Sequence, residues 1–414
     1  MDRLGVYFDQ RLVGGVTVDE SGRFSFEYDD GWIAQPESFA ISQSLPLKAE
    51  KHEEGVGHAF FANLLPDGHV RQLVARRLGL SESNDFALLD ALGGECAGAL
   101  VVSRSPPELG QPTYRPIDET EIAQLASRGR AFAETSGTGG IRLSLAGAQD
   151  KLPVKVEGGR LLLPVGASPS THILKFANRD YKHLPENELF VTRLAGQCEL
   201  PTVSAELTKI GKGRHLLVKR YDRVVDGSGN IQRLHQEDLC QGLGVPPGKK
   251  YEEEGGPRFD QCFAVIEGAS YEPALDTRAL IRWLAFNAIV GNADGHAKNL
   301  SLLRTAGRSI RLAPFYDLLS TAAYPRISSR LAMAVAGRSD PGQIQGKDWR
   351  ALAKTIGVGG FVEDTVRELA EELPERAETI RSSMTEQYGR LPVAEIVVAA
   401  IRKRSRRSLQ LLKL

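Results

Sequence analysis

The alternation of apolar and polar positions divides the chain into a part rich in short strands and a part that is almost wholly helical. Short apolar runs in the first part are separated by turn residues such as Asp9-Gln10 and Glu157-Gly158-Gly159, which are typical of hairpins. From about Arg233 onward, apolar positions recur with helical spacing instead. The predicted strands are 4–8, 11–18, 23–28, 152–156, 161–164, 171–176, 215–218, 300–303 and 310–313. The predicted helices are 58–65, 70–78, 84–92, 186–195, 279–290, 349–356, 362–373, 376–384 and 394–414, with a further helix that Asp118 or Thr120 caps.

This order of elements predicts a two-lobed α+β molecule with a site between its lobes. Residues 1–105 form the expected N-terminal α/β module, and the proline-rich stretch that follows opens a connector over 106–140. Residues 141–232 are expected to form a β-rich lobe, and 233–414 a helical lobe.

Composition and net charge exclude several classes of protein but do not identify the function. The chain has 414 residues, with 52 Lys and Arg against 52 Asp and Glu. This zero net charge excludes a polyanion binder that works through overall charge, and 42% hydrophobic residues exclude disorder along the whole chain.

The four cysteines contain no Cys-x-x-Cys pair, so free thiols are expected. No secretory signal opens the chain and no apolar run approaches the roughly 20 residues of a membrane span, so we expect a cytoplasmic protein with no membrane partner.

The most informative segment follows the apolar helix that ends at Gly291. It reads Asn-Ala-Asp-Gly-His-Ala-Lys-Asn over 292–299, and it continues through a predicted hairpin to Asp317. A hairpin of this length brings its ends together, so Asp294, Asn299 and Asp317 are expected at one edge. Two carboxylates and an amide at one edge suit phosphoryl transfer, in which a carboxylate orients the acceptor hydroxyl and the other oxygens hold Mg²⁺. The spacing from Asp294 to Asn299, followed by a distant Asp, is that of a protein-kinase catalytic loop.

Three other interpretations of this segment remain open. Asp, Gly, His and Asn are common in polar turns after helices, so the segment is also compatible with an ordinary turn. Asp294, His296 and Asp317 are alternatively the ligands of a metal-dependent phosphoesterase or nuclease. The third alternative is a catalytically silent kinase-fold partner in a DNA-binding repressor complex.

A kinase also requires a lysine that contacts phosphates and a carboxylate that holds that lysine. Lys175 ends a predicted strand, and Glu188 on the following helix is the preferred partner, with Glu186 as the alternative. An edge-strand lysine that prevents aggregation is the other interpretation of Lys175. No Walker motif occurs, but the glycines in 137–140 and 144–151 offer backbone N–H groups that phosphates bind. The polar residues 219–223 suit a connector whose backbone meets adenine.

Taken together, these motifs resemble the HipA family of serine/threonine-protein kinase toxins. The resemblance implies an α+β, two-lobed protein-kinase-like fold with a β-rich N-terminal lobe, an extra N-terminal α/β module and an all-helical C-terminal lobe. It covers nearly the whole chain. The segments that carry it are 144–151, 171–175, 219–223, 294–299 and 313–317, together with 63–68, 91–93 and 98–100 in the leading module.

The resemblance also implies the site residues and the cofactors, which are ATP and Mg²⁺. Asp294 is the implied catalytic base, and Asn299 and Asp317 are the implied metal ligands. Ser144 is an implied autophosphorylation site, where a phosphate dianion would repel the phosphates of ATP. The residues implied in ATP binding are Ala146, Gly147, Ala148, Gln149, Asp150, Lys151, Lys175, Lys219, Arg220, Tyr221, His296, Ala297, Lys298, Asn299, Tyr316 and Asp317.

Members of this family phosphorylate translation proteins such as an aminoacyl-tRNA synthetase. A small helix-turn-helix antitoxin neutralises them, and the pair binds operator DNA. We therefore expect a HipB-like partner, operator DNA through that partner, and a protein substrate in translation. The basic run at 402–407 is either the solvated face of a terminal helix or a contact with the DNA backbone in such a complex.

Overall fold

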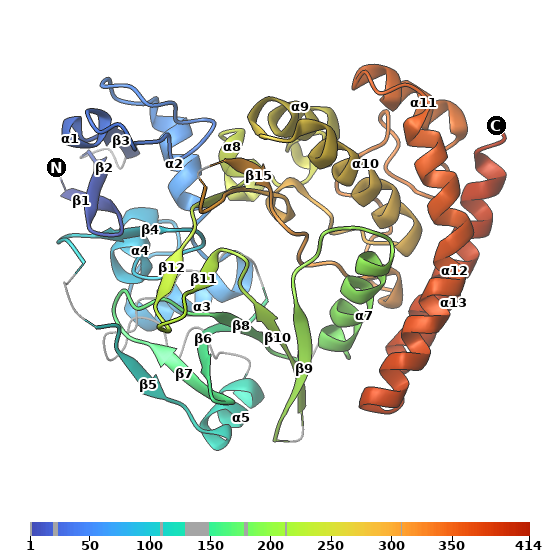
Figure 1. Ribbon diagram of the computed structural model, residues 1–414, viewed down its shortest axis with the longest axis horizontal. Helices are drawn as coiled ribbons and strands as arrows, with labels where there is room; N and C mark the ends of the chain where they lie inside the picture. The colour runs from blue at the N-terminus through green and yellow to red at the C-terminus, as the bar shows by residue number, and fades with distance from the viewer. Residues whose placement is uncertain are drawn as a thin grey trace. The chain divides into compact units, whose positions relative to one another are not determined.

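The computed structural model describes residues 2–19, 24–107, 111–128, 149–177, 181–211, 213–307 and 309–414. Its elements are labelled in Figure 1. The chain forms two units, each built from several stretches of sequence. Unit 1 comprises Met1–Asn178, Thr208–Gly248 and Leu303–Arg308, and unit 2 comprises Arg179–Leu207, Lys249–Leu302 and Ser309–Leu414.

Unit 1 begins with a four-stranded antiparallel sheet of order β3-β2-β1-β4. In β3 the aromatic residues Phe24, Phe26 and Tyr28 are buried while the residues between them are not, because successive side chains of a strand point to opposite faces. The strands are β1 (Asp2–Phe8), β2 (Arg11–Val18), β3 (Phe24–Tyr28) and β4 (Leu100–Ser103). The helices of this part are α1 (Asp30–Ile33), α2 (Glu54–Ala62), α3 (Gly68–Leu78) and α4 (Asp85–Leu92). The predicted helix limits hold at Gly79, which ends α3 with φ 66°, and at Asn84, which caps α4.

The second sheet has the order β5-β7-β6-β8-β10-β9. Gly158 and Gly159 both have positive φ, which produces the tight predicted turn between β6 and β7. Asp118 caps α5, since its Oδ1 accepts a hydrogen bond of 2.7 Å from the amide of Glu121. The strands are β5 (Tyr114–Pro116), β6 (Lys151–Glu157), β7 (Arg160–Pro164), β8 (His172–Lys175), β9 (Ala205–Ile210, of which 208–210 belong to unit 1) and β10 (Gly213–Lys219). Further elements of this region are α5 (Glu119–Arg128), β11 (Arg223–Val225), β12 (Ile231–Arg233), β13 (Gln236–Asp238), α8 (Leu239–Gly242) and η1 (Pro247–Lys249).

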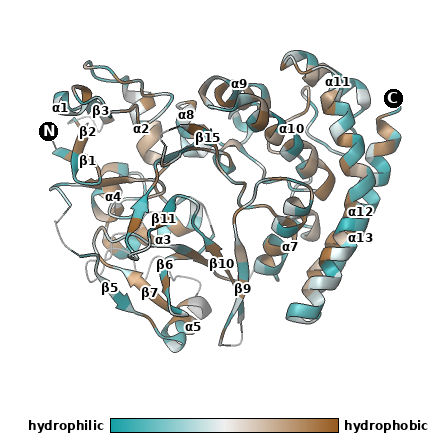
Figure 2. Ribbon diagram, in the orientation of Figure 1, coloured by the Kyte–Doolittle hydropathy of each residue, from teal (hydrophilic) through white to brown (hydrophobic). Residues whose placement is uncertain are grey.

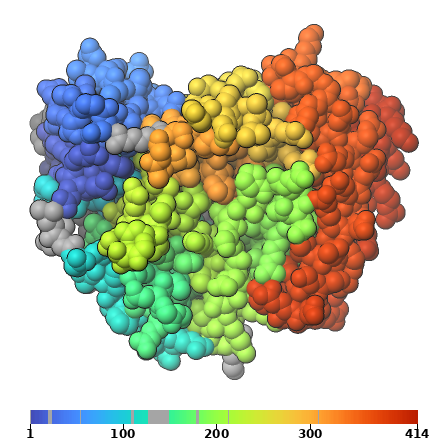
Figure 3. Space-filling view, viewed as in Figure 1, coloured from blue at the N-terminus to red at the C-terminus, as the bar shows by residue number. Residues whose placement is uncertain are grey.

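Unit 2 is mainly helical and is organised around the buried helix α10. Helix α10 is more apolar than α12 and α13, whose colouring alternates between hydrophilic and hydrophobic (Figure 2). Helices α12 and α13 run side by side (Figure 1), and the atoms of α7 lie against those of α12 (Figure 3). The helices are α7 (Leu184–Gln197), η2 (Glu252–Glu254), α9 (Phe259–Ala269), α10 (Pro273–Val290), η3 (Ala297–Asn299), η4 (Thr321–Ala323), α11 (Gly346–Thr355), α12 (Phe361–Tyr388) and α13 (Pro392–Leu411). The hairpin strands are β14 (Ser301–Arg304, of which 303–304 belong to unit 1) and β15 (Ile310–Leu312).

One helix prediction was wrong. The segments 362–373 and 376–384 are a single helix, α12, which runs through Pro374. An interior proline removes a hydrogen bond and costs about 3 kcal/mol. Here Leu373 and Ala377 are both completely buried on either side of it, so the packing of the apolar face outweighs the local cost.

Two expectations from composition can also be examined in the structure. The four cysteines are buried free thiols. None of the helices in the described ranges has both the length and the apolar character that a membrane span requires.

Candidate active site

The loop that carries the predicted base begins where α10 ends. Gly291 has φ 75°, and its amide donates to the carbonyl of Asn287 at 3.0 Å. A side chain at Gly291 would also meet Ala322 and Arg404 at 3.0 and 2.9 Å, so glycine is required by both conformation and space. The Thr321 hydroxyl donates to the carbonyl of Gly291 at 2.8 Å and accepts from the amide of Ala293 at 2.9 Å. These bonds fix the direction in which the loop leaves the helix.

Within the loop, main-chain and amide hydrogen bonds bring Asp294 and Asn299 together. The Asp294 amide donates to Asn292 Oδ1 at 3.0 Å, and the Asp294 carbonyl accepts from Asn299 Nδ2 at 2.8 Å. The His296 carbonyl accepts from the Asn299 amide at 2.9 Å. Because the bond to Asp294 uses the amide nitrogen of Asn299, the carbonyl oxygen Oδ1 is the acceptor end of this side chain. Such an oxygen is a suitable ligand for Mg²⁺.

The Asp294 carboxylate is held on one side and exposed on the other. Its Oδ1 accepts a 2.5 Å hydrogen bond from the hydroxyl of Tyr251 and lies 3.6 Å from Nε2 of His296. The side chain of Asp294 is nevertheless 44% exposed, whereas that of His296 is 4% exposed. A carboxylate that is oriented and still accessible has the properties that a general base needs.

His296 is a buried, neutral member of the loop. Burial lowers the pKa of His296 to about 4, against the opposing effect of Asp294. Its ring edge meets the ring of Tyr251 with 5.4 Å between centroids. At neutral pH, His296 therefore supports the loop as an uncharged ring and does not form an ion pair with Asp294.

The other end of the hairpin returns to the same loop through Tyr316. The Tyr316 hydroxyl donates to the carbonyl of Lys298 at 2.9 Å and lies 2.7 Å from the hydroxyl of Ser301. The next residue, Asp317, has φ 54°, which is uncommon outside glycine and concentrates at functional sites. Asp317 also acts electrostatically on His296 of the loop, and the meeting of Asp294, Asn299 and Asp317 at one edge stays a prediction.

The oxygen donors of this loop fit magnesium. Asn299 and Asp317 supply an amide and a carboxylate oxygen, and Mg²⁺ is usually held by one or two such groups together with water and substrate phosphates. Groups of three or more His, Cys, Asp and Glu side chains that could hold a metal are absent from the described residues.

In unit 1, the predicted phosphate-binding lysines lie opposite each other in the second sheet. Lys175 of β8 pairs with Lys151 of β6, and both side chains are buried. The Asp150 carbonyl accepts from the amide of Phe176 at 3.1 Å, and Gln149 Nε2 donates to the Phe176 carbonyl at 3.4 Å. The register of the sheet thus places both lysines at one level of neighbouring strands.

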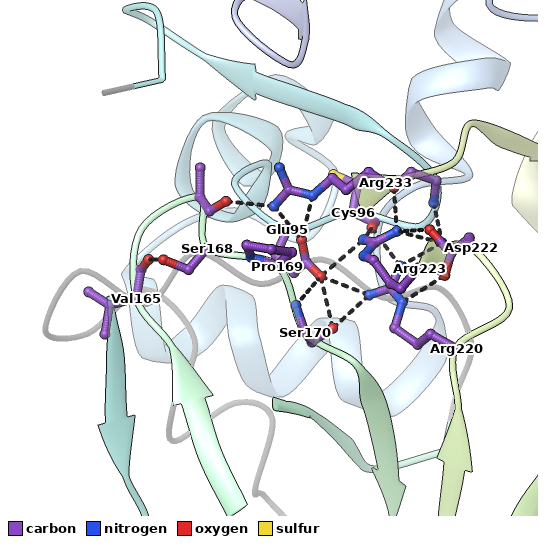
Figure 4. Close-up of polar contacts among 12 residues, drawn as sticks. Glu95, Cys96, Val165, Ser168, Pro169, Ser170, Arg220, Asp222, Arg223 and Arg233 are labelled. Carbon is purple, nitrogen blue, oxygen red and sulfur yellow. Dashed lines mark hydrogen bonds and ion pairs between the residues drawn. The ribbon is translucent and has the colours of Figure 1, made fainter. Parts of the chain in front are cut away.

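The predicted adenine connector continues from β10 into a buried ion network, shown in Figure 4. Lys219 is exposed and pairs with His172, and the hydroxyl of Tyr221 donates to Gln236. The Arg220 amide donates to the carbonyl of Thr171 at 3.0 Å. The Arg220 guanidinium is buried in the network, so any contact of Arg220 with a nucleotide would use the backbone.

Glu95 is the centre of this network. Its carboxylate accepts from Arg220 at 3.0 Å, from Arg223 at 3.0 Å and from Arg233 at 2.6 Å. It also accepts from both the amide and the hydroxyl of Ser170, at 2.9 and 2.8 Å. Burial by itself would raise the pKa of Glu95, but the three guanidinium groups hold this pKa well below its usual range. Glu95 is therefore ionised and fully paired.

Asp222 supplies the second negative charge of the network. It accepts from Arg220 at 2.7 Å, lies 3.0 Å from Arg223 Nη1, and accepts from the amide of Gly98 at 2.7 Å. Because Glu95 and Gly98 come from the N-terminal module and the arginines follow β10, the network ties that module to the connector within unit 1 (Figure 4).

Some predicted site residues lie outside the described residues, and one predicted contact joins residues of different units. Ser144, Ala146, Gly147 and Ala148 lie outside the described residues. Glu186 and Glu188 are buried on α7 in unit 2, whereas Lys175 belongs to unit 1, so their pairing with the lysine stays a prediction. The remaining residues of the catalytic loop, Ala297 and Lys298, are buried in η3.

The basic run on α13 is not one uniform surface. Arg402 pairs with Glu378 at 3.0 Å, and Arg407 donates to the carbonyl of Gly342 at 3.1 Å. Arg404 reaches the end of α10 beside Gly291, and burial lowers its pKa. The exposed members of the run are therefore Arg402, Lys403, Arg406 and Arg407.

Sequence reasoning missed Tyr251 and Glu95. Tyr251 is 43 positions from the aspartate to which it donates, and Glu95 is 125 positions from Arg220. Neither residue lies in a motif, and a contact at such separation leaves no local pattern. The cluster of charges at 219–223 was the one visible signal, because buried charges require partners.

The chain is similar to known proteins over most of its length. Residues 143–380 match the family model of the HipA-like C-terminal domain, and residues 4–103 match that of the HipA N-terminal domain. The chain is 42% identical over 364 residues to Y4mE of Sinorhizobium fredii, covering 86% of each protein. It is 30% identical over 368 residues to the serine/threonine-protein kinase toxin HipA of Shewanella oneidensis, covering 86% of this chain and 83% of that one.

A solved structure shows a similar fold over nearly the whole length. The structure of the Shewanella oneidensis toxin–antitoxin system HipA, HipB and its operator DNA contains a chain that superposes with a TM-score of 0.85. The two chains are 26% identical, and the match covers 99% of this chain and 98% of the other. This confirms the predicted α+β, two-lobed kinase-like fold.

Proposed function

The chain belongs to the HipA family, and from this premise we propose that it is an ATP- and Mg²⁺-dependent serine/threonine protein kinase that acts as the toxin of a toxin–antitoxin pair. The observation that carries the proposal is the loop of unit 2, where the accessible carboxylate of Asp294 lies one hydrogen bond from Asn299. Phosphoryl transfer depends mainly on such positioning and on charge stabilisation.

Each member of the loop has a distinct role in this proposal. Asp294 accepts the proton of the acceptor hydroxyl as the new bond to the γ-phosphorus forms and the bond to ADP breaks. Asn299 and Asp317 hold Mg²⁺, which neutralises charge on the phosphates when it is bound. Because the buried ring of His296 is uncharged at neutral pH, it adds no positive charge beside the base.

The residues of unit 1 bind the nucleotide. Lys175, Lys151 and the loop 146–150 contact the phosphates, and the backbone of 219–221 meets adenine. A network that fixes Arg220 and Asp222 on both sides of Tyr221 supports this role, because a preorganised connector loses little entropy when the nucleotide binds. Autophosphorylation of Ser144 would add a dianion beside the phosphate loop and oppose ATP binding.

The proposed partners follow from the family. The solved Shewanella oneidensis complex contains HipB and operator DNA beside HipA. We extend this arrangement to the present chain, with a small helix-turn-helix antitoxin that brings it to operator DNA. The exposed arginines of α13 are candidates for a contact with the DNA backbone in that assembly. The protein substrate is expected in translation.

Incubation of the purified chain with Mg²⁺ and labelled ATP tests the central claim. Wild-type protein should become phosphorylated on Ser144, and Asp294→Ala should reduce the rate by a factor of about 10² to 10⁴, because it removes the general base. Asp364→Ala, at an exposed aspartate of α12, is the matched control and should retain wild-type activity. Labelling that persists unchanged in Asp294→Ala would show that Asp294 is not the base.

A further inference from the structure

The segment before α9 holds a tyrosine in a fixed position beside the candidate base. The Tyr251 carbonyl accepts from the amides of Glu254 and Gly256 at 3.0 and 2.9 Å, which closes the tight turn of η2. Gly255 has φ 82°, and a side chain at Gly256 would lie 2.7 Å from the Tyr251 carbonyl. The backbone of Tyr251 is therefore held by a turn that only small residues can form.

The side chain of Tyr251 meets the catalytic loop at two points. Its hydroxyl donates to Asp294 Oδ1 at 2.5 Å, and its ring meets the buried ring of His296 edge to face, at an angle of 81°. Both contacts lie on the Oδ1 side of the carboxylate. The other oxygen, Oδ2, takes part in neither contact, which leaves it as the oxygen that an acceptor hydroxyl can approach.

The same turn is tied to the segment that follows Asp317. The Glu252 amide donates to the carbonyl of Ala332 at 3.0 Å, and the Glu252 carboxylate accepts from the amide of Ala334 at 2.6 Å. Glu253 adds an ion pair of 3.2 Å with Arg330. Residues 330–334 and the turn of η2 therefore form one connected structure, and Tyr251 is the part of it that reaches the base.

We propose that Tyr251 is a positioning residue for phosphoryl transfer and that Glu252 keeps it in place. The proposal rests on the kinase function proposed above. Tyr251 fixes Oδ1 of Asp294 so that Oδ2 receives the proton of the acceptor hydroxyl, while the acceptor oxygen bonds to the γ-phosphorus and the ADP oxygen leaves with the bonding electron pair. The tyrosine keeps its own proton throughout the step.

Single-turnover phosphorylation of the full chain with Mg²⁺ and labelled ATP tests this role. Tyr251→Phe removes only the hydroxyl and should slow transfer about 10- to 100-fold at saturating ATP, because a misoriented group loses rate of this order. The KM for ATP should stay within about twofold, since the hydroxyl touches the base and not the nucleotide. Tyr271→Phe, at a tyrosine of unit 2 that is 76% exposed, should behave as wild type.

A second pair of variants separates positioning from folding. Glu252→Ala removes the acceptor for the Ala334 amide and should reproduce part of the loss, whereas Glu252→Gln keeps an acceptor oxygen and should lose less. Thermal denaturation and binding of a fluorescent ATP analogue show whether each variant is folded.

Several outcomes would overturn the proposal. They are an unchanged rate in folded Tyr251→Phe, a change in KM alone, a faster reaction, and label on Tyr251 itself. A faster reaction, or label on Tyr251, would mean that the tyrosine occupies the position beside Asp294 that the acceptor hydroxyl needs. Absence of transfer in the wild-type chain would instead refute the kinase function, and the role of Tyr251 would fall with it.

Discussion

Two clusters of charged residues in this molecule differ in how completely their charges are paired. In unit 1, the side chain of Glu95 has no exposed surface and accepts hydrogen bonds from three arginines and a serine. In unit 2, the Asp294 carboxylate accepts a hydrogen bond from the Tyr251 hydroxyl and remains 44% exposed. Both carboxylates are oriented by neighbours, but only Asp294 presents an oxygen to solvent.

This difference distinguishes a carboxylate that stabilises the fold from one that can take part in catalysis. A buried carboxylate surrounded by donors can do little except hold them together, and its removal leaves uncompensated buried charges. A carboxylate oriented on one side and open on the other can accept a proton from a bound hydroxyl. Residue type alone does not distinguish these cases, because both residues follow glycine-containing turns or helix ends in the sequence.

The largest expected effect on stability is at Glu95. Glu95→Ala leaves Arg220 and Arg223 buried with Asp222 as their acidic partner, and it removes the carboxylate that pairs with Arg233. Breaking a buried ion network in this way costs about 3–5 kcal/mol. We expect the urea unfolding midpoint of the full chain to fall by a corresponding amount.

Two variants sharpen this comparison. Glu95→Gln keeps the shape and one acceptor oxygen, so it should cost less than Glu95→Ala. Asp294→Ala should slow transfer by a factor of about 10² to 10⁴ but leave the unfolding midpoint near that of wild type, since it removes a half-exposed group. If Glu95→Ala and Asp294→Ala shifted the midpoint equally, the distinction between the two clusters would be wrong.

The same contrast explains how far the sequence could predict the site. Asp294 and Asn299 lie in one contiguous motif after a helix that ends at Gly291, so local spacing alone predicts their contact. Tyr251 and Glu95 act over 43 and 125 positions respectively, and only the folded chain brings them to their partners.

The fold shows a similar limit. Strand β3, with its clear apolar alternation, and strand β8 were predicted close to their observed ends. Strand β9 was missed because five of its six residues are exposed or half-buried, so it lacks a buried face that alternation could reveal. Helix α12 was divided at Pro374 because the cost of proline is visible in the sequence, whereas the burial that offsets it is not.

Glu237 of β13 is an intermediate case, a buried carboxylate that accepts hydrogen bonds from the uncharged residues Ser42 and Gln43. It accepts from the hydroxyl of Ser42 at 2.5 Å and from the amide of Gln43 at 3.0 Å. Burial raises the pKa of Glu237 to about 7, with Asp238 acting in the same direction. The folded state therefore binds this proton more tightly than the unfolded state, and the stability it supplies below about pH 4.5 is lost as the pH rises towards 7.

Glu237→Gln should remove this dependence. The difference in unfolding free energy between the variant and wild type should grow in favour of the variant by about 1–3 kcal/mol between pH 5 and about pH 8. Burial lowers the pKa of the neighbouring His235 to about 4, which gives the opposite slope, but His235 is present in both proteins and cancels in the difference. A difference that stays flat over this range would mean that Glu237 is ionised in the folded state.

The smallest effect is expected where both partners of an ion pair are exposed. Arg390 and Glu395, at the start of α13, form two hydrogen bonds of 2.9 and 3.1 Å, a geometry as good as that of the Glu95 contacts. Their side chains are 77% and 44% exposed, so water competes for both and salt screens their attraction. Arg390→Ala should therefore leave Tm unchanged within error, at low salt and at about 0.5 M salt alike. A loss of stability comparable to that of Glu95→Ala would show that geometry, and not burial, determines which charges hold this fold together.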